Sequence, residues 1–232
     1  VSELNRLVSA EPATPVPPGG AIPRNAAGRL TGELTDTAKR LAPLPPPPPM
    51  TLAVLEAQQK KLNEYGLTSI RIPGTNVAAY RRFQQLRDSG KATVRYSILF
   101  RPKDLADFRS SIVGGGIRQG EGDEWVKVWG IKISVDGGFE GGYMTRPYEG
   151  EMGKGGTYYG LQTIPQATFN EYVAGINQAG WRVAVHAVGD AAVDEVLQGY
   201  ERAHAQRDIR AQGWTIEHAF ITRPDQYPRI RA

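Results

Sequence analysis

Residues 130–137 read GIKISVDG, and this stretch decides the fold together with two later ones. Residues 183–190 read VAVHAVGD, and residues 215–219 read TIEHA. Each is a short run of apolar and β-branched residues, which favours a buried strand. Each also ends in one group able to bind a metal, because imidazoles are ordinary zinc ligands and a lysine supplies a carboxylate once its amine is carbamylated. These three groups are Lys132, His186 and His218.

Strand-like and helix-like segments alternate along most of the chain. The predicted strands cover residues 67–72, 92–100, 125–135, 182–188 and 215–219. The predicted helices cover residues 51–65, 77–89, 103–112, 165–179 and 191–204. Strands that alternate with helices of this length are typical of parallel βα units. The sequence therefore predicts an α/β fold with about five parallel strands, a partial (β/α)8 barrel of the TIM type whose catalytic groups collect at the carboxyl ends of the strands.

The first fifty residues differ in composition from the remainder. They are rich in Pro, Gly and Ala and end in a run from Pro45 to Pro49. We assign residues 1–50 to an irregular Pro/Gly-rich segment and residues 51–232 to the partial barrel. A polyproline linker is one interpretation of the segment. We favour the other, an ordered loop over residues 20–35 followed by a flexible proline stretch.

Composition excludes several classes of function. The 232 residues hold 28 Lys and Arg against 24 Asp and Glu, interspersed and without a basic stripe, so we predict no nucleic-acid partner. No apolar run approaches the ~18 residues of a membrane span, so we predict no membrane association. Without cysteine there are no disulfides or thiolate metal sites. A soluble protein is expected, and its compartment stays open between the cytoplasm and export.

The three strand-end motifs resemble those of the metal-dependent amidohydrolase superfamily, most closely its amidohydrolase-3 branch. The resemblance rests on IKISVDG around Lys132, VHAVGD around His186 and IEHAF around His218, and it extends over nearly the whole chain. It implies a carbamylated Lys132 that bridges two metals, with His186 and His218 as ligands at the ends of strands 5 and 6. It also implies a divalent metal, zinc first, and a hydrolase that cleaves amide or other non-peptide C–N bonds of small molecules.

Two parts of the family pattern have no counterpart in the sequence. The pattern has a His-x-His pair upstream and an aspartate downstream as general base, whereas the chain holds three histidines, the third being His204. We therefore expect this chain to be the middle of a longer enzyme. The alternative is a catalytically incomplete fragment or a binding module that needs a complementary chain. A partial barrel also leaves open sheet edges, which predicts self-association.

The surroundings of each candidate residue refine these expectations. Apolar and polar residues alternate over 131–136, so Lys132 can point into the barrel, where a buried amine has a lowered pKa and can react with carbon dioxide. Without the first histidine pair one metal loses most of its ligands, so we expect an unmodified amine here. Glu217 is expected on the opposite face of its strand, paired with a neighbouring element. Asp190 is expected to cap the helix that follows it, and His204 to lie at the surface.

Residues 136–164 interrupt the alternation with nine glycines and four tyrosines. A structureless stretch of this length is usually functional or disordered. We favour an active-site wall that shapes substrate choice over a plain surface excursion. Arg146 and Tyr148 are candidates to bind a substrate carboxylate or carbonyl. Asp136 is a third candidate for substrate contact, although shaping of the turn is the interpretation we favour for it.

Overall fold

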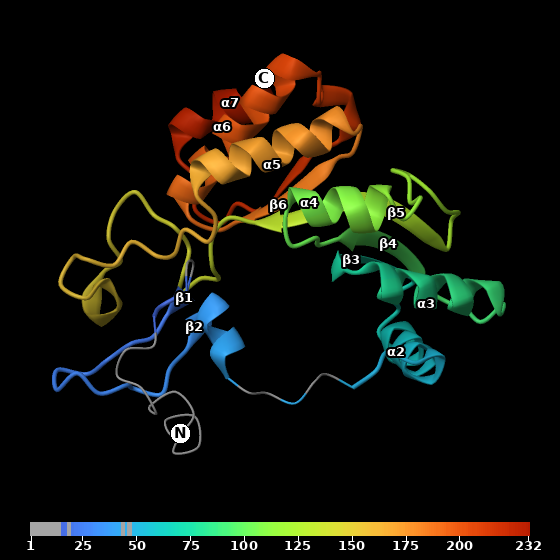
Figure 1. Ribbon diagram of the computed structural model, residues 1–232, viewed down its shortest axis with the longest axis horizontal. Helices are drawn as coiled ribbons and strands as arrows, with labels where there is room; N and C mark the ends of the chain where they lie inside the picture. Colours follow the sequence, from blue (N-terminus) through green and yellow to red (C-terminus); the bar gives the residue numbers. More distant parts are fainter. Residues whose placement is uncertain (1–14, 18–19, 43–44, 46–47) are drawn as a thin grey trace.

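The computed structural model describes residues 15–17, 20–42, 45 and 48–232, and Figure 1 shows its ribbon. Part of the predicted irregular segment, including Gly19 and two prolines of the proline run, lies outside the described residues. The division of the chain at residue 50 stays a prediction.

A small two-stranded unit lies within the first fifty residues. Strand β1 (Gly20–Ala21) pairs antiparallel with β2 (Thr35–Asp36), and the 3-10 helix η1 (Thr37–Leu41) follows. Ile22 and Ala38 are buried in a cluster separate from the main core. This unit therefore has its own minor apolar centre.

One parallel sheet organises the rest of the chain. Its strands are β3 (Ser69–Thr75), β4 (Arg95–Phe100), β5 (Val126–Ser134), β6 (Val183–Ala187) and β7 (Thr215–His218). They follow one another in space in chain order, and every neighbouring pair is parallel. Figure 1 shows the sheet curling into half a barrel, with the helices on its outer side. The predicted α/β class and the five parallel strands are confirmed.

The helices connect the strands. They are α2 (Leu52–Glu64), α3 (Val77–Asp88), α4 (Leu105–Asp107) with the π-helical η2 (Phe108–Val113), α5 (Gln166–Gln178) and α6 (Asp190–Gln206). Short pieces are η3 (Gly150–Gly153), η4 (Arg210–Gln212), η5 (Pro224–Gln226) and α7 (Tyr227–Arg231). None of the described helices combines the length and the apolar character needed to cross a bilayer.

Local sequence explains the first two long helices. The Thr51 hydroxyl accepts a hydrogen bond from the backbone of Val54 at 3.2 Å, and the Asn76 side chain accepts one from Ala79 at 2.8 Å. Both side chains satisfy N–H groups that the first helical turn leaves without partners. Gly66 adopts φ +71° directly beyond α2, a conformation that costs glycine little. The predicted helix over residues 51–65 is confirmed to within one residue at each end.

Two local predictions were wrong, and a third holds for helical structure but not for the type of helix. Strand β3 does not end at residue 72, as predicted, but continues through Pro73 to Thr75, because an edge strand tolerates proline and a register shift at Gly74 absorbs the bend. The predicted helix 103–112 consists of one α-turn followed by a π-helix. Asp190 is the first residue of α6, and Gly189 is its N-cap.

The main core lies between the sheet and its outer helices. Phe100 and Phe108 both stand edge-on to Trp181, with ring centroids 6.5 and 5.6 Å away. Outward-facing strand residues such as Ile131 and Val185 are fully buried in the same cluster. This packing leaves the inner, concave face of the sheet to the polar residues of the strands.

Candidate active site

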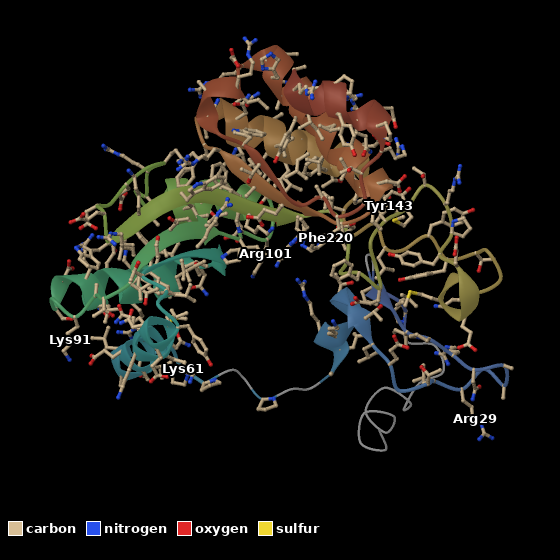
Figure 2. The ribbon with its side chains drawn as sticks, turned by 180° about the vertical axis from the view of Figure 1, so that it is seen from behind. Arg29, Lys61, Lys91, Arg101, Tyr143 and Phe220 are labelled. Carbon is tan, nitrogen blue, oxygen red and sulfur yellow. The ribbon has the colours of Figure 1, made fainter. Side chains whose placement is uncertain are left out.

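The strand register brings polar residues together on the concave face. Ser134 of β5, His186 of β6 and Glu217 of β7 stand side by side, and Lys132 lies two residues earlier on β5. Because alternate residues of a strand share a face, Lys132 and Ser134 point the same way. All lie near the carboxyl ends of their strands, as expected for a barrel site. Figure 2 shows Arg101 and Phe220 on this same concave side.

An ion pair joins two strands that are not neighbours. The Lys132 ammonium contacts the Glu217 carboxylate across β6, and the Arg71 guanidinium of β3 forms an ion pair with the other Glu217 oxygen at 3.1 Å. Burial lowers the pKa of Lys132, which is 5% exposed, while Glu217 opposes that shift. Arg71 also stacks on the ring of Trp129 at 3.7 Å. The Glu217 carboxylate therefore pairs with two cationic side chains at once.

The expected orientation of Glu217 was wrong. Its side chain shares the concave face with His186, its register partner, and does not lie opposite the site. Glu217 does pair with charged side chains of the sheet, but they come from β3 and β5, which supply Arg71 and Lys132 and are not adjacent to β7. The prediction assumed that His218 points into the site and that Glu217, the preceding strand residue, must therefore point away from it. The assumption fails because the backbone at His218 does not have regular strand geometry.

His218 leaves regular strand geometry and turns toward His186. His218 has φ +77° and Ala219 has φ +47°, both in the left-handed region that non-glycine residues seldom adopt. The two imidazole rings meet edge to face, with centroids 4.4 Å apart. Burial lowers the pKa of His218, and His186 and Lys132 lower it further, which favours the neutral imidazole that metals bind.

The hydrogen bonds of His186 assign its tautomer. Its Nε2 lies 2.8 Å from the carbonyl oxygen of Gly137 and 3.4 Å from a carboxylate oxygen of Asp136. A carbonyl can only accept, so Nε2 carries the proton and donates. The lone pair on Nδ1 then remains available to a ligand.

Asp136 organises the backbone around this histidine. Its carboxylate accepts hydrogen bonds from the N–H groups of Val188 and Gly189, at 2.9 to 3.0 Å, and from Tyr143 at 3.0 Å. Burial raises the pKa of Asp136, and these donors oppose the shift. Gly189 is required in this turn, because a Cβ there would stand 2.0 Å from the carbonyl oxygen of Tyr143. These contacts match the turn-shaping interpretation of Asp136.

The loop over residues 136–164 is fixed at a second carboxylate. Thr145 donates to Asp190 through its backbone, at 2.9 Å, and through its hydroxyl, at 2.5 Å. Arg223, beyond β7, donates to the same carboxylate at 2.8 Å. Asp190 thus ties the loop after β5 to the loop after β7.

The two loop candidates for substrate binding lie in different environments. Arg146 is exposed, and its side chain makes no hydrogen bond or ion pair with the described residues. The Tyr148 hydroxyl lies 2.8 Å from the Gly142 carbonyl and 3.0 Å from that of Phe139, so it serves the loop itself. Substrate contact by either residue stays a prediction, as does contact by Asp136.

Several residues of the site were not singled out from the sequence. Arg71, Phe139 and Phe220 lie in or beside it, and Arg101 donates to the Ser134 hydroxyl at 3.0 Å. A signal existed for Arg101, because it directly follows the predicted strand 92–100 and therefore stands at the same sheet edge. Phe139 lies in a glycine-rich loop whose path the sequence pattern does not define.

The donor set fits a metal ion only in part. Two imidazoles of adjacent strands, with ring centroids 4.4 Å apart, are suitable nitrogen ligands. Across residues 15–17, 20–42, 45 and 48–232, however, no group of three or more His, Asp or Glu side chains is arranged to hold an ion. The described residues would therefore contribute two ligands to a site, with the Lys132 amine held by Glu217.

The model of the amidohydrolase family matches residues 4–232. The chain belongs to this family. The putative amidohydrolase YtcJ of Bacillus subtilis (strain 168) is 23% identical over 93% of this chain, and Protein LONG AFTER FAR-RED 3 of Arabidopsis thaliana is 28% identical over 88%. The chain spans 41% and 36% of the lengths of these two relatives.

Solved structures support the same barrel fold for this member of the amidohydrolase family. An uncharacterised metal-dependent hydrolase from Pyrococcus furiosus matches with a TM-score of 0.67 and 22% identity, over 99% of this chain and 45% of that one. Another from Pyrococcus horikoshii OT3 matches with a TM-score of 0.61 and 23% identity, over 78% of this chain and 36% of that one. The predicted superfamily and fold are confirmed.

Proposed function

We propose that this protein is a metal-dependent hydrolase that cleaves amide or other non-peptide C–N bonds of small molecules. The observation that carries the proposal is the edge-to-face pair of His186 and His218 at the carboxyl ends of β6 and β7. Membership of the amidohydrolase family supports the reaction class. Zinc as the metal extends this proposal. Lys132 would act as a carbamylated bridge only in a longer protein that supplies the remaining ligands, whereas in this chain its amine pairs with Glu217.

The two histidines would be ligands of a divalent metal, His186 through Nδ1. A bound metal of this kind polarises a carbonyl and lowers the pKa of water. The described residues contribute binding and orientation. Gly137 and Asp136 fix the His186 ring, and Asp136 fixes the turn that carries Val188 and Gly189.

Around the two imidazoles the concave face is cationic. Arg71 and Lys132 share one carboxylate partner, Glu217, and Arg101 donates to the uncharged Ser134 hydroxyl. This arrangement favours a substrate oxygen with developing negative charge, because preorganised cations stabilise such charge without reorganisation. A small polar amide is therefore the substrate class that these residues support.

Hydrolysis assays test the proposal. The protein, with any flanking residues that its coding sequence adds, is incubated with N-acyl and formamide substrates in the presence and absence of Zn²⁺. We expect metal-dependent release of amine that is lost in His186→Ala and His218→Ala and retained in His204→Ala. His204 is the matched control, since it lies in the last turn of α6 and pairs with Asp208 instead of the strand-end residues. Substrate binding without turnover in the metal-loaded protein would contradict the proposal and favour the binding-module alternative.

A further inference from the structure

The register of β6 and β7 does not by itself bring His218 to the site. It pairs His218 with Ala187, whose side chain is fully buried in the outer core. A regular strand would direct His218 toward that same outer side, because residues paired across parallel strands share a face. Instead His218 and Ala219 are both left-handed. The turn moves the imidazole to His186, and such a backbone persists only where its surroundings hold it.

Backbone contacts hold the turn itself. The N–H of Ala219 donates to the carbonyl oxygen of Ala187 at 2.9 Å, and that of Ile221 donates to Val188 at 3.1 Å. They fix the path of the chain but leave the side-chain torsions of His218 free. Within the described part of the chain, the His218 imidazole makes no hydrogen bond or ion pair. Its orientation therefore depends on the rings that contact it.

A stack of two phenylalanines lies against this imidazole. The rings of His218 and Phe220 are stacked at 5.4 Å with an interplanar angle of 24°. Phe220 in turn stacks on Phe139 at 4.5 Å and 27°. Both phenylalanines are largely exposed, at 55% and 66%, so burial does not account for where they stand. Their contacts are instead with aromatic rings, Phe139 with Phe220 and Phe220 with His218.

The two phenylalanines come from different loops. Phe139 belongs to the loop 136–164 after β5, and Phe220 follows β7. That loop is anchored in turn by Asp136 and Asp190. The stack thus passes from an anchored loop, over the end of β6, to the imidazole of β7.

We propose that Phe139 and Phe220 are positioning residues that hold the His218 imidazole against His186, so that the loop after β5 sets the geometry of the metal ligands. This inference rests on the proposed function for the identity of the ligands. The ring geometry itself is independent of any metal. Groups that orient metal ligands typically change metal affinity by 10- to 100-fold when they are removed.

Histidine NMR tests the proposal directly, because the chain contains only three histidines. In the metal-free protein, the stacked ring of Phe220 should shift the His218 ring protons upfield. We expect Phe220→Leu and Phe139→Leu to move the His218 signals downfield and to leave those of His204 unchanged. Phe220→Tyr should retain the upfield shift, because it keeps the ring. Tyr65→Leu, at an exposed aromatic residue beyond α2, is the matched control and should change neither.

Zinc titrations of the same samples measure the consequence. We expect Phe220→Leu and Phe139→Leu to weaken the zinc-induced shifts of His186 and His218 by about tenfold or more, with Phe220→Tyr close to wild type. Unchanged His218 shifts and unchanged zinc affinity in both leucine variants would overturn the proposal. If zinc moves neither histidine in the wild type, the proposed function fails, while the metal-free spectra still decide whether the stack positions His218.

Discussion

Lys132 and Glu217 form an ion pair across an intervening strand. Lys132 lies on β5 and Glu217 on β7, with β6 between them. The residue of β6 in register with Lys132 is Ala184, whose methyl group leaves room for the longer side chain to cross. Both partners are mostly shielded from water, with side chains 5% and 17% exposed. The pair therefore fixes the spacing of the three strands that carry the candidate site.

Glu217→Gln should destabilise the fold, because it leaves the buried ammonium of Lys132 and the guanidinium of Arg71 without their anion. Removing one partner of a buried pair costs about 3–5 kcal/mol, and the partial exposure of Glu217 places this pair near the lower end. Urea unfolding followed by far-UV circular dichroism measures the change. Glu64→Gln, which breaks a surface pair with Lys61, should change the free energy of unfolding by less than about 1 kcal/mol.

The double variant Lys132→Met with Glu217→Gln tests whether the destabilisation comes from the broken ion pair or from loss of the Glu217 carboxylate alone. Because the buried charge is removed together with its partner, the double variant should be more stable than Glu217→Gln alone. Equal or additive destabilisation would contradict the contact between these two residues.

Much of the fold could be predicted because its signals are local. Thr51 and Gly66 bound α2 through capping and positive φ, and the apolar runs before Lys132 and His186 lie within strands β5 and β6. Parallel pairing then follows from the alternation of strands and helices. These features depend on residues within a few positions of one another, so they can be predicted from a single sequence.

The interior of the site could not be predicted in the same way. The position of His218 depends on its left-handed backbone, which strand alternation does not include, whereas Glu217 keeps the regular register position beside His186. The contact of Arg71 with Glu217 depends on how strongly five strands curl, a property of the whole sheet. Phe139 reaches Phe220 through a loop whose course is set by the carboxylates of Asp136 and Asp190.

Zinc should bind weakly and substoichiometrically to the 232-residue chain. Zinc sites in proteins usually have three or four protein ligands, and the described residues offer two imidazoles. Isothermal titration and elemental analysis should show less than one tightly held ion per chain. Binding should disappear in His186→Ala or His218→Ala and persist in His204→Ala. Two tightly bound metals per chain would contradict this prediction and would require further ligands.

The stability of the protein should fall as the pH rises from about 4.5 to about 7, because of Glu195. This carboxyl group is 3% exposed, one of its oxygens accepts a hydrogen bond from Gln162 at 3.1 Å, and the other has no partner. Burial raises its pKa from 4.5 to about 7. The folded state therefore binds a proton more tightly than the unfolded state within this window, and that advantage is lost above it.

Glu195→Gln removes this titration. Relative to wild type, the variant should gain stability on going from pH 5 to pH 8, by on the order of 3 kcal/mol at most, since one pKa unit corresponds to about 1.4 kcal/mol. Urea unfolding at both pH values measures the difference. Glu171→Gln, at an exposed position on α5, should show no such pH-dependent gain.

The 232-residue chain should self-associate through the outer strands of its sheet. In the described residues, β3 and β7 each pair with a strand on one side only, so their other edges present unpaired N–H and C=O groups. Sedimentation velocity should show a species larger than a monomer whose fraction rises with protein concentration. Ser69→Lys places a charge at the start of β3 and should reduce that fraction, because lysine on an edge strand opposes pairing. Ser110→Lys adds the same charge in η2, away from both edges, and should leave the fraction unchanged. A monomer at all concentrations would show that these edges are protected in solution.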